Sequence, residues 1–191
     1  MPAWKYTGMV ATGSDAFEIK DLEVAPDRQF KIDPAAAIIA APIYLYPFLQ
    51  LAETTIAVTL SGMAVHFIDL CKELFAEKIK QPRLSDQQKA LLTEELKSAE
   101  TEIDRQRKMF YDVVEHSWKA IENDNIIPDE LLKAVSNISH ALARVSREVV
   151  DKLYPLCGLA AAHTSSEINR AWRDLHTASQ HSLFTFGPPA S

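Results

Sequence analysis

The chain has 191 residues, of which 47% are hydrophobic and 24% charged, which are ordinary values for one soluble globular domain or one domain plus part of another. Its 5 glycines are too few for a loop-rich all-β fold, and its formal net charge of −6 argues against nucleic-acid binding, which usually uses a clustered basic face. The two cysteines, Cys71 and Cys157, are interpreted as reduced core thiols of a cytoplasmic protein rather than as a disulfide.

The first 33 residues differ in pattern from the rest of the chain. Apolar residues there alternate imperfectly with charged ones, as on a half-buried strand: Phe17, Ile19, Leu22 and Val24. The preceding ATGSD, Ala11–Asp15, is typical of a turn. We therefore expect a short β-hairpin remnant, which needs a sheet to join because a lone hairpin is marginal in water.

A charge-poor region, 35–68, raises the question of a membrane span. Pro42, Pro47, Gln50 and Glu53 interrupt it, whereas a span needs about 20 mostly apolar residues. A buried helix of a soluble bundle is the favoured interpretation. Residues 1–15 contain no apolar run of the length that a signal peptide needs, so we expect no membrane association and a cytoplasmic location.

Everything from about Tyr46 onward is predicted to be helical, in four helices over about 46–78, 85–122, 128–157 and 164–180. The first helix carries apolar residues around nearly its whole circumference, so we expect it to be buried on all sides: Leu49, Leu51, Ile56, Val58, Leu60, Met63, Val65, Phe67, Leu70 and Leu74. We expect part of this apolar surface, Phe67 included, to lie between subunits.

Capping patterns mark the starts of two of these helices. Ser85 with Gln88 and Thr164 with Glu167 both fit a capping box. The fold class is therefore predicted to be all-α, an up-and-down four-helix bundle over 34–186 that follows the β remnant in 1–33. The last residues, 187–191, are predicted to be a disordered tail.

Several kinds of chemistry are excluded by missing motifs. No Glu-x-x-His pair supports a di-iron bundle, and neither C-x-x-C nor H-E-x-x-H suggests zinc. No Gly-rich phosphate loop and no G-x-S-x-G elbow is present. Four histidines are isolated on predicted helices and are interpreted as structural: His66, His116, His140 and His163. We therefore expect no metal site.

The stretch AWRDLHTASQH, 171–181, is the densest cluster of polar groups near the end of the chain. On a helix, Arg170 can pair with Asp174 and with Glu167, and a histidine near the C-terminus suits the helix dipole. A charged surface helix therefore explains the stretch without any activity. Spacing alone leaves an active-site role open.

The residues around this stretch resemble the acyl-CoA dehydrogenase superfamily. The order R-x-W-R-D-x-H-x-x-x-x-H, after C-G and a capping pattern, is similar to the family's last helix. At the other end, WKYTGMVATGSD followed by FEIKDLEVAPDRQF looks like the end of the family's middle β-domain. The resemblance covers nearly the whole chain, and it is strongest for the group D flavin-dependent monooxygenases.

This resemblance implies a flavin, FAD or FMN, between the β-domain and the bundle, and a bundle that also builds a tetramer. Dehydrogenases of the family use a glutamate base near their end, but HTASQHSLFTFGPPAS contains no glutamate. In the monooxygenase branch a histidine of this segment lies near the flavin C4a position, and His181 matches it. A titrating histidine suits proton delivery near neutral pH.

The resemblance also assigns roles to other residues. Arg173 and Asp174 correspond to a structural ion pair that aims the terminal segment. Ser179 and Gln180 are expected to line the flavin. Two hydroxyls of the N-terminal turn, those of Thr12 and Ser14, could contact cofactor or substrate, although a plain tight turn explains them equally.

Two functions of different classes follow. The chain is either the C-terminal half of a flavin-dependent oxidoreductase, which contributes one wall of a flavin site and the oligomer interface, or a non-catalytic helical assembly module. In the first case a separately encoded N-terminal half could complete the site, and the isolated chain would have little activity because so much of the pocket is missing. Both cases predict a homo-oligomer, dimer or tetramer.

Overall fold

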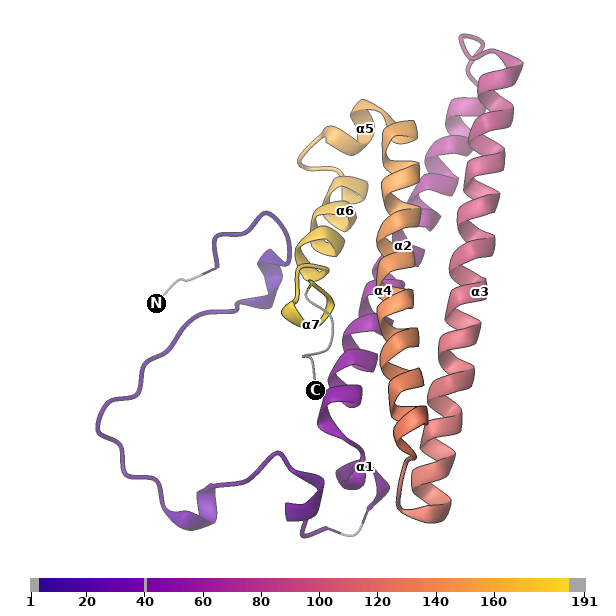
Figure 1. The fold of residues 1–191 in the computed structure, drawn as a ribbon. Helices are drawn as coiled ribbons and strands as arrows, with labels where there is room; N and C mark the ends of the chain where they lie inside the picture. Colours follow the sequence, from indigo (N-terminus) through magenta and orange to yellow (C-terminus); the bar gives the residue numbers. More distant parts are fainter. Residues whose placement is uncertain (1–3, 40, 186–191) are drawn as a thin grey trace.

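The structure, a computed structural model, describes residues 4–39 and 41–185. In this part of the chain three long helices and one shorter helix build a bundle: α2 (Phe48–Ile79), α3 (Asp86–Asp124), α4 (Asp129–Cys157) and α6 (Glu167–Ala178) (Figure 1). Smaller elements connect and flank them: 3-10 turns η1 (Val10–Thr12), η2 (Pro26–Arg28) and η3 (Pro34–Ala36), and helices α1 (Pro42–Leu45), α5 (Leu159–Ala162) and α7 (Ser182–Thr185). The prediction of an all-helical bundle is confirmed.

Helix α2 is the central element of the bundle. It packs against α3, α4 and α6, which explains why its sequence is apolar around most of its circumference. By length and hydropathy alone it could cross a membrane, as an 18-residue window has a mean hydropathy of 1.4. The contacts with its three neighbours bury 44% of this window, so the expectation that the helix is buried on all sides within the chain is met only in part. The large side chains that are buried most completely come chiefly from α2, α3 and α4: Leu60, Phe67, Phe75, Ile103, Phe110, Ile121, Leu142 and Leu153.

The two helices with predicted N-terminal caps differ in outcome, since one cap is confirmed and the other is not. The capping box at Ser85 is confirmed, with the Gln88 amide N–H 3.2 Å from Ser85 Oγ and the Ser85 N–H 2.9 Å from Gln88 Oε1. The predicted cap at Thr164 is wrong. Ser166 caps α6 instead, because the helix begins at Glu167 and the Ser166 hydroxyl accepts from the Asn169 N–H.

The predicted β-hairpin remnant is not found in the described residues. The chain from Ser14 to Ala25 runs without helix or strand and bends away from the bundle (Figure 1). Its apolar side chains are exposed, Phe17 at 86% and Leu22 at 65%. A strand needs a neighbouring strand as its hydrogen-bonding partner, and residues 4–39 and 41–185 contain no strand. The boundary at 33/34 stays a prediction, and the predicted tail, 187–191, lies outside the described residues.

A buried carboxylate lies between α2 and α4. Glu53 has no exposed surface, and its Oε1 lies 3.2 Å from Nε2 of His140. Its Oε2 has no hydrogen-bond partner among the described residues. A buried carboxylate without partners is costly, so His140 is the group that makes this carboxylate tolerable.

Replacing His140 with alanine should therefore lower the free energy of unfolding by about 3 kcal/mol, since one buried charged group loses its partner. The pair Glu53→Leu with His140→Ala should recover much of the loss, because the buried carboxylate is then gone. Urea denaturation of the parent, of Glu53→Leu and His140→Ala as single variants, and of the double variant measures both effects. Strictly additive losses would show that Glu53 and His140 are not coupled.

Candidate functional site

The N-terminal segment docks against α6, so that the two ends of the described chain meet. The Met9 N–H donates to Asp174 Oδ1 at 2.5 Å, and Arg173 Nη1 donates to the Thr7 carbonyl at 2.8 Å. Met9 has a left-handed backbone, φ 57°, which is uncommon for a residue with a side chain. These contacts fix a loop that would otherwise have no element to support it.

Gly8 is the point of closest approach between this segment and α6. A Cβ at this position would lie 2.1 Å from the Arg173 carbonyl oxygen and 2.6 Å from Thr177 Oγ1. No side chain fits into that space, so only glycine permits the contact. The interface thus depends on the glycine of the W-K-Y-T-G sequence.

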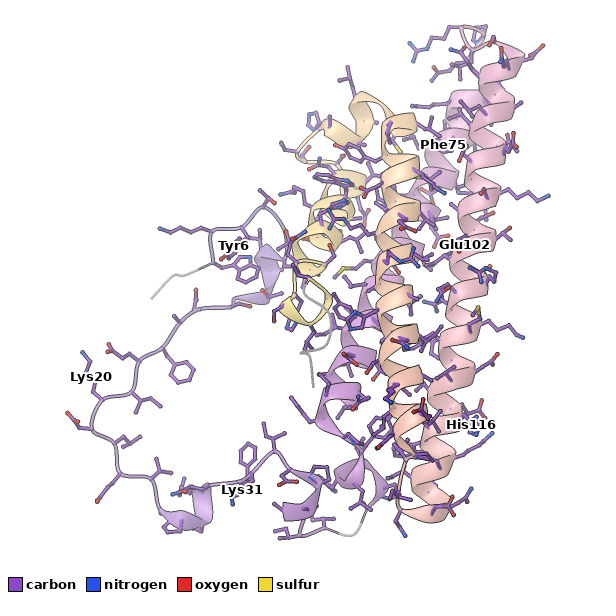
Figure 2. The ribbon with its side chains drawn as sticks, in the orientation of Figure 1. Tyr6, Lys20, Lys31, Phe75, Glu102 and His116 are labelled. Carbon is purple, nitrogen blue, oxygen red and sulfur yellow. The ribbon has the colours of Figure 1, made fainter. Side chains whose placement is uncertain are left out.

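A cavity of about 930 Å³ opens between the docked segment, α6 and the first turns of α2. Figure 2 shows Tyr6 on the segment, which lies beside α6 and α7. Aromatic side chains, hydroxyl groups and the polar end of α6 make up most of the lining: Trp4, Lys5, Tyr6, Thr7, Met9, Thr12, Ser14, Thr55, Ile56, Thr59, Trp172, His176, Thr177, Ala178, Gln180 and His181. A cavity of this size is typical of sites for small molecules.

Four of the residues singled out in the sequence lie together in this cavity. Thr12 and Ser14 come from the docked segment, whereas Gln180 and His181 come from the turn between α6 and α7. The Thr12 and Ser14 hydroxyls are 2.9 Å apart and hydrogen-bond to each other. Ser179 is not among the lining residues, and its hydroxyl donates to the His176 carbonyl of its own helix at 3.2 Å.

His181 lies at the start of α7, with a defined hydrogen bond. Its Nδ1 accepts the Leu183 N–H at 3.3 Å, as a cap at the beginning of a helix does. In the neutral ring the proton must then be on Nε2. Nε2 has no hydrogen-bond partner among the described residues, so this N–H can be donated to a ligand.

The expected ion pair between Arg173 and Asp174 is not formed in the described structure. Neighbouring residues on a helix point in different directions, and each side chain finds its own partner. Arg173 binds the Thr7 carbonyl and Asp174 binds the Met9 N–H. Both thus hold the N-terminal segment onto α6. Arg170 pairs with Glu167 at 3.0 Å, as expected, and not with Asp174.

An aromatic stack on α6 was not singled out in the sequence. The Trp172 ring stacks on the His176 ring at 4.3 Å between centroids and on the Tyr154 ring at 4.8 Å. His176 Nε2 lies 2.8 Å from Asp151 Oδ1 on α4. The four-residue spacing of Trp172 and His176 was a signal that they share a helix face, but nothing local in the sequence pairs that face with Asp151.

The composition of the lining limits what the cavity can bind. Aromatic faces together with hydroxyl, amide and imidazole groups suit a planar ring system with polar edges. Lys5 is the only lysine or arginine among the lining residues, so the cavity offers little to a phosphate. It has no aspartate or glutamate, and the described residues contain no cluster of His, Cys, Asp and Glu that could hold a metal.

Comparison with known proteins adds a family. The family model described as "Acyl-CoA dehydrogenase, C-terminal domain" matches residues 54–186. Over 188 residues the chain is 23% identical to the oxygenase subunit HsaA of a flavin-dependent monooxygenase from Rhodococcus jostii (strain RHA1), over 93% of this chain and 49% of the relative. The HsaA subunit of Mycobacterium tuberculosis (strain CDC 1551 / Oshkosh) is 25% identical over 187 residues, again over 93% of this chain and 48% of the relative.

Two solved structures have the same fold. The 3-HSA hydroxylase from Rhodococcus sp. RHA1 superposes with a TM-score of 0.86 at 20% identity, over 97% of this chain and 50% of that one. The HsaA monooxygenase from M. tuberculosis gives a TM-score of 0.83 at 22% identity, with the same coverage of 97% and 50%. The chain spans about half the length of the curated relatives it matches.

Proposed function

This chain belongs to the acyl-CoA dehydrogenase family, whose C-terminal domain accounts for residues 54–186, and from that premise we propose that it contributes one wall of a flavin site in an oxygenase. The observation that carries the proposal is the cavity in which Thr12, Ser14, Gln180 and His181 lie together. These residues come from opposite ends of the chain, and the family resemblance of the two sequence motifs points to each of them.

The lining fits the ring system of a flavin, which is planar, aromatic and polar along one edge. The chemistry that a bound flavin supplies is the activation of dioxygen for insertion into an organic substrate. Tyr6 and Trp172 offer apolar faces that exclude water from such a ring. Thr12, Ser14 and Gln180 offer the hydrogen bonds that orient its polar edge.

His181 is the proposed proton donor. Its Nδ1 is held by the Leu183 N–H, which directs the proton to Nε2 in the neutral ring. A histidine can both give and regain a proton near neutral pH, as oxygen chemistry in such a site requires. The Ser179 hydroxyl donates to the His176 carbonyl of its own helix. We therefore assign Ser179 a structural role in the turn before His181.

An oxygenase fits this lining better than an acyl-CoA dehydrogenase does. Removal of a substrate α-proton needs a base, and no carboxylate lines the cavity among the described residues. The two HsaA relatives, which are oxygenase subunits of flavin-dependent monooxygenases, point the same way. We therefore place the chain with the monooxygenase branch.

The choice between FAD and FMN depends on groups outside this cavity. With Lys5 as the only lysine or arginine in the lining, the cavity holds the ring and not the phosphates. We expect the phosphate contacts and the opposite wall to come from sequence equivalent to the unmatched half of the relatives, on the same polypeptide or on a separately encoded one. Activity should need that other half.

A flavin titration tests this proposal. Purified chain should quench riboflavin fluorescence, and His181→Ala should weaken the affinity by about tenfold, the effect of losing one hydrogen bond to the ring. His163→Ala is the matched control, because His163 is exposed and lies outside the lining of the cavity. The riboflavin affinity of this variant should equal that of the parent. Equal affinities for all three proteins would remove His181 from the site.

Absence of any riboflavin quenching by the parent chain would favour the other function, a helical module that serves assembly. An exposed apolar surface supports an assembly role in either case. Only 44% of the most apolar window of α2 is buried within the chain, and Phe17, Phe30 and Ile38 are 85% or more exposed. We propose a homo-oligomer, dimer or tetramer, in the cytoplasm, and light scattering should give the mass of two or four chains.

A further inference from the structure

The two cysteines lie side by side in the core, on different helices. Cys71 of α2 and Cys157 of α4 are 86 positions apart in sequence, and their Sγ atoms are 3.4 Å apart. Their residues are 0% and 1% exposed. A disulfide has an S–S length of about 2.05 Å, so a relative shift of about 1.4 Å would bring the sulfurs into bonding distance.

The two thiols differ in their surroundings. The hydrogen bond from Cys71, and the nearby Lys78 ammonium, lower the pKa of Cys157, while burial opposes this shift. The same hydrogen bond and burial raise the pKa of Cys71. Lys78 Nζ also donates to the carbonyls of Leu156, at 2.6 Å, and of Cys157, at 2.8 Å. The two sulfurs are therefore not equivalent, and the position of each in its helix decides which one a peroxide can reach.

Cys157 also occupies a part of the fold that can open. It is the last residue of α4, and Gly158 ends the helix with a φ of 65°. Pro155 lies inside the last turn and cannot donate a backbone hydrogen bond. Fraying of this one turn would break the Lys78 hydrogen bonds to the Leu156 and Cys157 carbonyls and expose Cys157, while the rest of the bundle stays folded. Cys71, in the interior of α2, has no such route to solvent.

From this geometry we propose that Cys71 and Cys157 form a redox pair, which hydrogen peroxide converts into a disulfide between α2 and the end of α4. The Cys157 thiolate attacks one peroxide oxygen, the O–O bond breaks, and hydroxide leaves and is protonated to water. The Cys71 sulfur then attacks the resulting sulfenic acid, the S–S bond forms, and the S–O bond breaks. The released oxygen leaves as water with the Cys71 proton, so the two thiols lose two electrons and the peroxide yields two waters.

A Cys71–Cys157 disulfide would restrain the segment that carries α5 and α6. Residues 159–178 begin two positions after Cys157 and contain α5 and α6, and α6 carries Trp172 and His176 into the cavity. A disulfide fixes the start of this segment to α2 and suppresses fraying at the end of α4. In a reducing compartment such a bond is transient, as expected of a sensor and not of a structural crosslink.

Intact mass analysis of the full chain tests the inference without any flavin, so its outcome is independent of the proposed function. After removal of reductant, hydrogen peroxide should lower the mass by about 2 Da, and a proteolytic peptide pair should join Cys71 to Cys157. The loop closed by the bond is long, so the melting temperature should rise by about 5–15 °C and fall again with dithiothreitol.

Two variants separate the steps. Cys71→Ser should stop at a sulfenic acid on Cys157, which dimedone traps, whereas Cys157→Ser should leave Cys71 as an unmodified thiol. Two titratable thiols after peroxide treatment of the parent would overturn the proposal. So would crosslinks that form only between chains. Dimedone capture on Cys71 in preference to Cys157 would reverse the assigned order and contradict the argument from the helix end.

Discussion

Replacing Phe67 with aspartate should abolish cooperative folding of the chain. Phe67 is 0% exposed and lies in the main core cluster on α2, the helix that contacts α3, α4 and α6. Loss of the ring costs about 3–5 kcal/mol, and burial of an unpaired carboxylate adds a further penalty. The sum approaches the whole stability of a typical domain, about 5–15 kcal/mol. Circular dichroism should show no cooperative thermal transition.

The same substitution at an exposed phenylalanine of α2 is the control. Phe48→Asp should leave the transition in place, because Phe48 is 54% exposed and an acidic residue suits the first turn of a helix. The sequence led us to expect Phe67 between subunits. The structure corrects this, since Phe67 is buried within a single chain. A folded Phe67→Asp protein with altered oligomeric mass would restore the earlier interpretation.

Replacing Gly8 with alanine should remove the cavity while the bundle stays folded. The added Cβ would lie 2.1 Å from the Arg173 carbonyl oxygen, a backbone atom that cannot move without distorting α6. The segment must therefore leave α6 and lose its bonds to Arg173 and Asp174. Riboflavin affinity should fall by more than about tenfold, and trypsin should cleave faster after Lys5.

Gly62→Ala is the matched control for this prediction. Gly62 lies inside α2 with open space around its potential Cβ, so alanine should stabilise the helix by about 0.5–1 kcal/mol. Its riboflavin affinity and its cleavage after Lys5 should equal those of the parent. A Gly8→Ala protein that behaves as this control does would show that the segment is not held where the structure has it.

Local signals predicted the long helices well. The apolar periodicity, the Ser85 capping box and Pro128 gave bounds that lie within a few residues of those of α2, α3 and α4. The hairpin prediction was wrong because alternation around Phe17 describes a strand only when a neighbouring strand pairs with it. No pattern around Phe17 indicates whether such a neighbouring strand is present.

The site was partly predictable for a related reason. His181 and Gln180 could be selected because the terminal motif resembles that of a family, and the same holds for Thr12 and Ser14. The clash that requires glycine at Gly8 and the contact between His176 and Asp151 could not be predicted, because each joins segments that are distant in sequence. Such contacts depend on tertiary packing, so a local sequence pattern does not predict them.

Hydrogen–deuterium exchange with and without saturating riboflavin tests the central claim, a flavin wall between the N-terminal segment and α6, most directly. The account predicts slower exchange in residues 4–14 and 172–185, and unchanged exchange in α3, which contributes no residue to the cavity. Unchanged exchange in both segments at saturation, or protection confined to α3, would contradict it.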